Sequence, residues 1–125
     1  MAFIPHTLNE GGHPPFEYLP AKAGAVELGM ALEFTGGKVV KISAGTTVPK
    51  YFSLVTKTCA DGEIIPVQKL ETGVDYETTS AATLSEGDVG KKVALNTDGL
   101  QVTSNTTDGV AQIVSVDGKK IVVRF

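Results

Sequence analysis

Five glycine-containing dipeptides divide most of this chain into short segments that have the length of β-strands. In a two-residue hairpin turn the central backbone positions need positive φ, which glycine adopts freely and aspartate tolerates better than most residues. Alternating apolar residues flank most of these dipeptides, and this combination is a strong local signal for a β-hairpin. The five dipeptides are Gly36-Gly37, Asp61-Gly62, Asp98-Gly99, Asp108-Gly109 and Asp117-Gly118. The pattern therefore predicts an all-β fold, a small barrel or sandwich of short antiparallel hairpins.

The size and composition of the chain fit this prediction. Its 125 residues suit one domain with a single hydrophobic core. Only five Phe and three Tyr are aromatic and Trp is absent, so aliphatic side chains must fill most of that core. The 14 glycines favour a barrel or sandwich over a helical bundle, because a glycine in a helix interior costs roughly 1 kcal/mol.

Charge and hydropathy limit the partners that the chain can have. The formal net charge of −3 argues against a nucleic-acid partner, because clustered Lys and Arg bind phosphates. The basic doublets Lys91-Lys92 and Lys119-Lys120 lie beside predicted turns, where lysines commonly protect a sheet edge. No apolar run approaches the roughly 20 residues of a membrane-spanning helix, and the first residues lack the pattern of a cleaved signal peptide. We therefore expect synthesis in the cytoplasm, with no nucleic-acid and no membrane partner.

Residues 1–24 do not follow the pattern of residues 25–125, and we expect an extended N-terminal arm before a β-barrel-like domain. The arm contains four prolines, and each lacks an N–H and restricts its predecessor to extended conformations, which excludes a long helix or a central strand. Its apolar residues are too numerous for a disordered tail. We expect them to dock on a neighbouring chain; the alternative is that the arm wraps its own barrel. The candidate partner-binding residues are Phe3, Ile4, Leu8, Phe16, Tyr18 and Leu19.

Three hairpins are predicted locally. Two of them, at Asp98-Gly99 and Asp117-Gly118, share the plan of apolar strand, Asp-Gly and apolar strand, and Gly36-Gly37 is a weaker version of it. Val93 and Leu95 precede Asp98-Gly99, and Leu100 and Val102 follow it. Residues 30–43 alternate around Gly36-Gly37, and residues 110–125 alternate around Asp117-Gly118. A short strand is expected over residues 74–78, followed by a loop or a short helix up to residue 83.

The middle of the chain is expected to hold one further hairpin. Residues 51–57 are predicted to form a strand, which Asp61-Gly62 turns into a second strand over residues 63–70. Pro66 lies inside that second strand and removes one ladder donor. It should therefore lie at a sheet edge, at a bulge, or with its nitrogen facing away from the partner strand.

Few residues in the sequence suggest catalysis or metal binding. His6 and His13 are the two histidines, and neither has an Asp, Ser or Cys at the spacing of a triad or a metal site. The single Cys59 cannot form an internal disulfide and is expected to be a small buried or half-buried side chain. Residues 87–90 lack the lysine and the following helix of a phosphate-binding loop. We therefore predict a protein that is not an enzyme, with no catalytic residue, no metal site and no cofactor.

The layout of an extended arm before a small domain of short strands, together with three phrases, resembles a known family. The phrases are VELGMAL (residues 26–32), EGDVGKKV (86–93) and GVAQIV (109–114). They resemble the head-decoration, or capsid-cement, proteins of tailed bacteriophages and related prophages. The resemblance implies a structural virion protein on the outer surface of the expanded capsid, commonly a homotrimer at three-fold and quasi-three-fold positions. Such a protein clamps neighbouring subunits of its partner, the major capsid protein.

A physical argument supports such a role, and two other functions stay open. An extended arm can add a strand to a sheet edge on another chain, and three such contacts in a trimer raise the apparent affinity. A carbohydrate- or ligand-binding β-module of a tail or adhesin would need an aromatic platform on the body. An enzyme with an active site at a subunit interface would need Cys59, Asp88 or the arm histidines. The residues available for the platform are Tyr51, Phe52, Tyr76 and Phe125.

Overall fold

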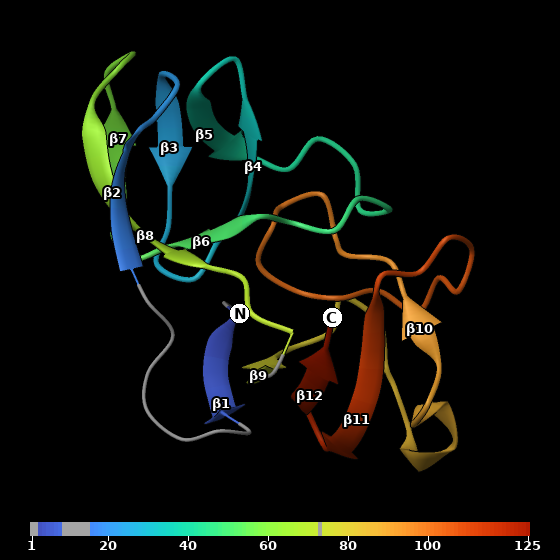
Figure 1. Ribbon diagram of the computed structural model, residues 1–125. Helices are drawn as coiled ribbons and strands as arrows, with labels where there is room; N and C mark the ends of the chain where they lie inside the picture. Colours follow the sequence, from blue (N-terminus) through green and yellow to red (C-terminus); the bar gives the residue numbers. More distant parts are fainter. Residues whose placement is uncertain (1–2, 9–15, 73) are drawn as a thin grey trace.

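The computed structural model describes residues 3–8, 16–72 and 74–125. Two five-stranded antiparallel sheets and one two-stranded sheet form the fold (Figure 1). The described residues contain no α-helix, only the 3₁₀-helix η1 (Glu86–Asp88), and no helix among them is long and apolar enough to cross a membrane. The all-β prediction is confirmed. The arrangement is that of a small sandwich, since neither large sheet closes into a barrel within the described ranges.

The first large sheet contains the N-terminal strand and the C-terminal hairpin. Its strands, in spatial order, are β1 (Ile4–Leu8), β9 (Val74–Thr78), β12 (Lys120–Arg124), β11 (Ala111–Asp117) and β10 (Lys92–Val93). The predicted strand over residues 74–78 is confirmed as β9, which lies between the two ends of the chain. β1 and β10 each have one neighbour, so they are the edges of this sheet.

The second large sheet has β2 at one edge and β5 at the other. Its strands, in spatial order, are β2 (Phe16–Pro20), β8 (Ile64–Lys69), β6 (Tyr51–Ser53), β4 (Ala31–Thr35) and β5 (Lys38–Lys41). A bridge between Ala21 and Val39 brings the two edges together at one end. The small sheet pairs β3 (Gly24–Val26) with β7 (Lys57–Cys59).

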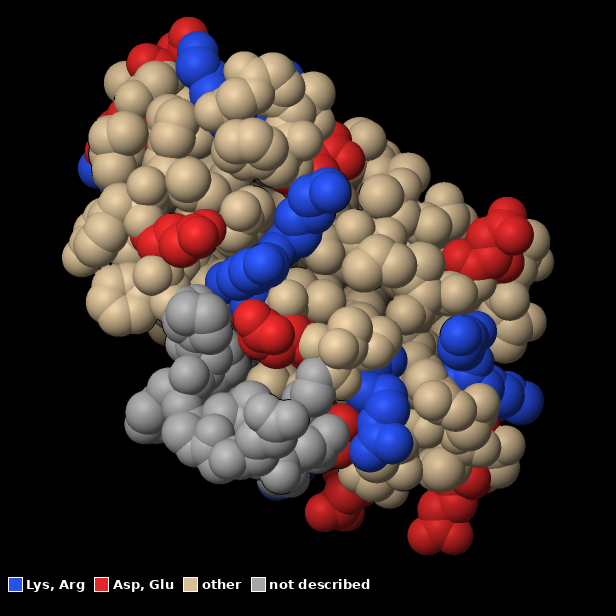
Figure 2. Space-filling model, in the orientation of Figure 1, with Lys and Arg blue, Asp and Glu red and all other residues tan. Residues whose placement is uncertain are grey.

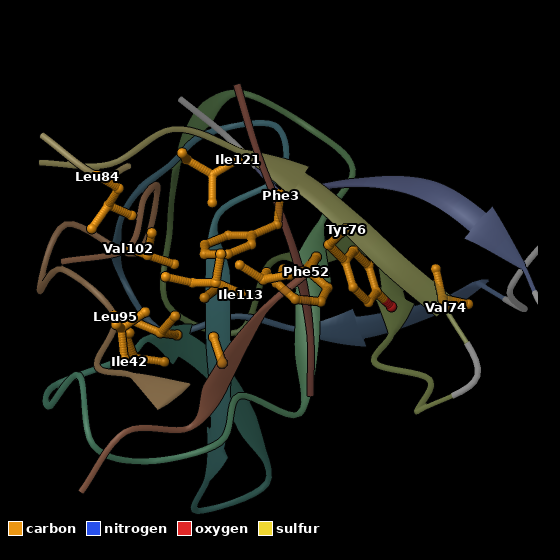
Figure 3. Packing of buried hydrophobic residues seen from close by; sticks show 14 residues of the cluster. Phe3, Ile42, Phe52, Val74, Tyr76, Leu84, Leu95, Val102, Ile113 and Ile121 are labelled. Atoms are coloured by element: carbon orange, nitrogen blue, oxygen red, sulfur yellow. The ribbon is translucent and has the colours of Figure 1, made fainter. Parts of the chain in front are cut away.

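Two clusters of buried side chains lie on opposite faces of the second sheet. The first cluster fills the space between the two large sheets, where Phe52 of β6 meets Tyr76 of β9 and Ile113 of β11 (Figure 3). The second cluster contains Leu32 of β4 and Val67 of β8, together with residues of the small sheet. The second sheet is therefore buried on both faces over its centre.

Two of the three locally predicted hairpins are confirmed. β4 and β5 pair across Gly36-Gly37, and both glycines have the positive φ that the turn requires. β11 and β12 pair across Asp117-Gly118, with an irregularity in the ladder between Ile113 and Ser115. Around Asp98-Gly99 the described residues form only an isolated antiparallel bridge between Leu95 and Val102, so the hairpin predicted there is wrong.

The prediction of one strand over residues 51–57 is wrong. The chain leaves the second sheet after Ser53 and forms β7 in the small sheet, so Asp61-Gly62 joins two strands, β7 and β8, that do not pair. The Ser53 hydroxyl donates to the Val55 carbonyl at 2.7 Å and accepts from the Val55 N–H at 3.2 Å. Because these local bonds compete with a sheet ladder, they turn the chain away from β8 at this point.

Pro66 lies in β8, which has neighbours on both sides, so it is not at a sheet edge. The Pro66 carbonyl accepts the Leu54 N–H at 3.1 Å, on the side where β6 has already ended. The N–H and C=O of one strand residue point to the same side, so the missing donor also faces that side. The Pro66 nitrogen thus faces residue 54 of the segment that was expected to pair with it, so the expected arrangement is wrong. The missing donor is tolerated because β6 has ended at Ser53.

The N-terminal segment belongs to both sheets. β1 pairs with β9 and β2 pairs with β8, so the prediction that residues 1–24 stay outside the β pattern is wrong for residues 4–8 and 16–20. The prolines are compatible with these strands because both strands lie at sheet edges, where one side of the backbone needs no partner. The prolines in β1 and β2 therefore did not prevent strand formation, because both strands lie at sheet edges.

Candidate binding surface

Three large apolar side chains lie exposed together on the outer face of β2 and β8. Phe16 is 60% exposed, Tyr18 is 65% exposed and Ile64 is 57% exposed. The Phe16 and Tyr18 rings contact each other edge to face, with centroids 6.0 Å apart. We call Phe16, Tyr18 and Ile64 the apolar strip.

The register of β2 against β8 places these residues on one face. Tyr18 lies opposite Pro66 and Pro20 lies opposite Ile64, and paired residues of an antiparallel ladder share a face. The alternate residues, such as Leu19 and its partner Ile65, point into the second cluster. β2 and β8 thus present apolar side chains on both faces, although only one of these faces is covered.

The apolar strip continues a face that is buried elsewhere. Gln68 of β8 pairs with Phe16 on one side and with Phe52 on the other, so the three residues share a face. Phe52 is fully buried against the first sheet, whereas Phe16 lies beyond the area that this sheet covers. Figure 2 shows mostly uncharged atoms along the border of the molecule where Figure 1 draws β2. The surface thus has the chemistry of a core face without a covering layer.

The backbone of β2 offers unpaired hydrogen-bonding groups beside the strip. The Ala21 N–H donates to the carbonyl of Glu63, just before β8, while the next N–H, of Lys22, donates to the carbonyl of Val39 in β5 on the opposite side. Because strand residues alternate between sides, the backbone groups of Phe16 and Tyr18 point away from β8. Within the described part of the chain they have no backbone partner. This edge can accept an added strand.

The opposite face of β2 is polar at its exposed end. Burial and the adjacent Glu17 carboxylate, which accepts a hydrogen bond from the Tyr51 hydroxyl, raise the pKa of Tyr51. Glu17 therefore points toward Tyr51, away from the apolar strip.

The predicted partner-binding residues separate into four groups. Phe16 and Tyr18 are exposed and keep their role as a prediction, and Leu19 is half-buried against the second cluster. Phe3 is only 2% exposed and packs in the first cluster of its own chain, so in this arrangement it completes its own core, and its contact with a partner stays a prediction. The backbones of Ile4 and Leu8 pair with β9, and their side chains lie outside the described part of the structure.

Ile64 belongs to the strip but was missed from the sequence. Ile64 and Ile65 are adjacent apolar residues at the start of β8, so alternation alone does not tell which of them faces the core. Pro66 supplies the signal that separates them. Proline is mostly exposed in proteins, and Ile64, two positions before Pro66, lies on the same face of the strand.

Reactive groups do not gather at this surface. Among the described residues, no group of three or more His, Cys, Asp or Glu side chains could hold a metal ion. Cys59 is buried, as predicted. The side chain of His6 and the whole of His13 lie outside the described residues. A shallow hollow of about 610 Å³ between the loop 79–84 and the turn of the β11–β12 hairpin is lined mainly by small residues.

No protein-family model matches this chain, and a search of curated proteins finds no similar protein.

Proposed function

We propose that this protein is a structural virion component that binds the outer surface of a phage capsid. It would stabilise the expanded head by clamping neighbouring subunits of the major capsid protein, and it would act as a homotrimer. The observation that carries the proposal is the apolar strip beside the open edge of β2. The resemblance of the sequence to capsid-cement proteins supplies the identity of the partner.

The strip and the edge suit a protein partner. Burial of one large apolar side chain contributes on the order of 1.5–3 kcal/mol, so the three side chains of the strip supply a useful amount of binding energy when they are covered. An extended segment of the partner could also pair with the backbone of Phe16 and Tyr18. In a trimer, three such contacts would act together and raise the apparent affinity through effective concentration.

The aromatic arrangement favours this proposal over a carbohydrate-binding module. Phe52 and Tyr76, two of the four residues available for a platform on the body, are fully buried. The exposed pair, Phe16 and Tyr18, has its rings inclined by 70°. Two rings at that angle do not form one continuous flat platform for successive sugar rings.

The direct test mixes the purified protein with expanded heads that lack it and images the particles. We expect protrusions at local three-fold positions. The double variant Phe16→Ser/Tyr18→Ser should bind at least tenfold more weakly, equivalent to about 1.4 kcal/mol per site, with an unchanged melting temperature. The matched control is Leu28→Ser, because Leu28 is also exposed and lies outside β2 and β8. Equal occupancy for the double variant and the control would exclude the strip as the binding surface.

A further inference from the structure

The site that holds the N-terminal residues is formed entirely by distant parts of the chain. The Phe3 N–H donates to the Gly29 carbonyl at 3.0 Å. The Phe3 ring lies beside that of Phe52 (Figure 3). The two ring centroids are 5.3 Å apart, and the centroid of Phe125 is 6.0 Å from that of Phe3. β1 then pairs with β9 on the side opposite β12.

The connection between β1 and the rest of the molecule is local to one edge. β1 pairs with β9 alone, and β2 lies in the other sheet, so the two successive strands do not hold each other. The ladder is also imperfect, since Pro5 lacks a donor and the register shifts between Pro5 and Thr7. Opening this edge therefore breaks few hydrogen bonds, and it exposes the ring of Phe3.

We propose that the edge of β9 and the site of Phe3 also receive the segment Phe3–Leu8 of a second copy, so that copies of this chain exchange their N-terminal strands. The complementary chemistry is already present, because the segment that would bind is identical to the one that fills the site. Seven residues, 9–15, separate β1 from β2 along the chain. Exchange of an identical element between protomers is a low-cost route to assembly.

Concentration decides between the two arrangements. The contacts of β1 are the same in both, so the difference lies in the connecting segment and in the entropy of association. A short connection between a strand and its own site gives an effective concentration on the order of mM, so a dilute solution favours a chain that holds its own strand. Exchange in one direction around a ring would suit a cyclic oligomer. Such exchange does not require that the capsid is the partner.

A disulfide across the β1–β9 ladder can detect the exchange in full-length protein. Ile4 and Glu77 are Cα partners, and antiparallel partners lie within the range that a disulfide can span. In a Cys59→Ala background, one preparation carries Ile4→Cys and the other carries Glu77→Cys. The two are mixed near ~1 mM with oxidised glutathione, and the linked heterodimer is measured on a non-reducing gel. Replacing Glu77→Cys with Ser104→Cys gives the control for random collisions, because Ser104 is exposed and lies outside every strand.

We expect at least fivefold more linked heterodimer than in the Ser104→Cys control, and less of it on dilution. A single chain with both Ile4→Cys and Glu77→Cys should instead close internally in dilute solution. Heterodimer at the control level, while that double variant closes fully, would overturn the proposal.

A second measurement does not depend on added cysteines. Deleting Gly11 and Gly12 shortens the connection and makes it harder for a chain to hold its own strand. The oligomeric fraction measured by light scattering should then rise. An unchanged mass distribution in a variant that remains folded would count against strand exchange.

Discussion

β1 and β2 come from one proline-containing segment, and each is the outermost strand of its sheet. The residue just before β1, Phe3, lies in the core between the two sheets, whereas the aromatic residues of β2 lie in solvent. Composition does not separate the two strands, because both carry large apolar side chains. What differs is the covering layer, since Phe3 lies where both large sheets meet and Phe16 lies beyond the first sheet.

This contrast separates two roles that the sequence suggested for a single arm. The end that carries Phe3 completes the core of its own chain, and the end that carries Phe16 and Tyr18 presents a surface. A partner that covers the apolar strip would extend the sandwich by another layer, as the first sheet already does over Phe52.

The largest effect should come from removing both strands. Deletion of residues 1–20 removes two edge ladders and the side chain of Phe3, so we expect a loss of more than about 5 kcal/mol, which is comparable with the whole stability of a small domain. Circular dichroism during urea denaturation would measure it. A truncated protein with an unchanged unfolding transition would show that neither strand contributes to stability, and that the segment is a separate arm.

A matched pair of substitutions tests the two ends separately. Phe3→Ala should lower the free energy of unfolding by about 3–5 kcal/mol, because it leaves a cavity among packed aromatic rings. Phe16→Ala should change it by less than about 0.5 kcal/mol, as exposed positions usually do. Equal losses at the two positions, measured by denaturant unfolding, would mean that the comparison between core and surface is wrong.

The parts of the fold that the sequence predicted well are those governed by local backbone chemistry. Gly36-Gly37 and Asp117-Gly118 place hairpins correctly because their turns need positive φ, a requirement that is visible in single residues.

The parts that were missed depend on contacts distant in the sequence. The burial of Phe3 depends on Phe52 and Phe125, and the break after Ser53 depends on a choice between two sheets. For the candidate surface, Phe16 and Tyr18 were named from their aromatic character, but their exposure follows from the limited extent of the first sheet. No local pattern contains that information.

Two tyrosines extend the comparison to alkaline pH. Burial raises the pKa of Tyr76 above its ordinary value of 10.0, although the Glu71 N–H donates to its oxygen. A group whose pKa is raised in the folded state contributes stability that is present below pH 10 and is lost as the pH rises through the folded pKa. Melting temperatures above pH 10 should therefore fall less for Tyr76→Phe than for the unmodified protein, although the variant loses about 1 kcal/mol at neutral pH.

The control for this experiment is Tyr18→Phe, which changes an exposed tyrosine of the apolar strip. It should leave the melting profile close to that of the unmodified protein over the same pH range. If Tyr18→Phe protected the fold at high pH as well as Tyr76→Phe does, the alkaline transition could not be assigned to the core.

The smallest effect is expected at Ile64, and it tests whether the strip is free in the isolated protein. Ile64→Thr keeps a β-branched side chain that suits a strand, so the free energy of unfolding should change by less than about 0.5 kcal/mol. Ile65→Thr, one residue further along β8, places a hydroxyl in the second cluster and should cost about 1–3 kcal/mol. If Ile64→Thr were as costly as Ile65→Thr, something would have to cover the strip. Repeating the measurement over a range of protein concentrations would then identify the cover: a cost that disappears on dilution would come from a second copy, and a constant cost would come from the chain itself.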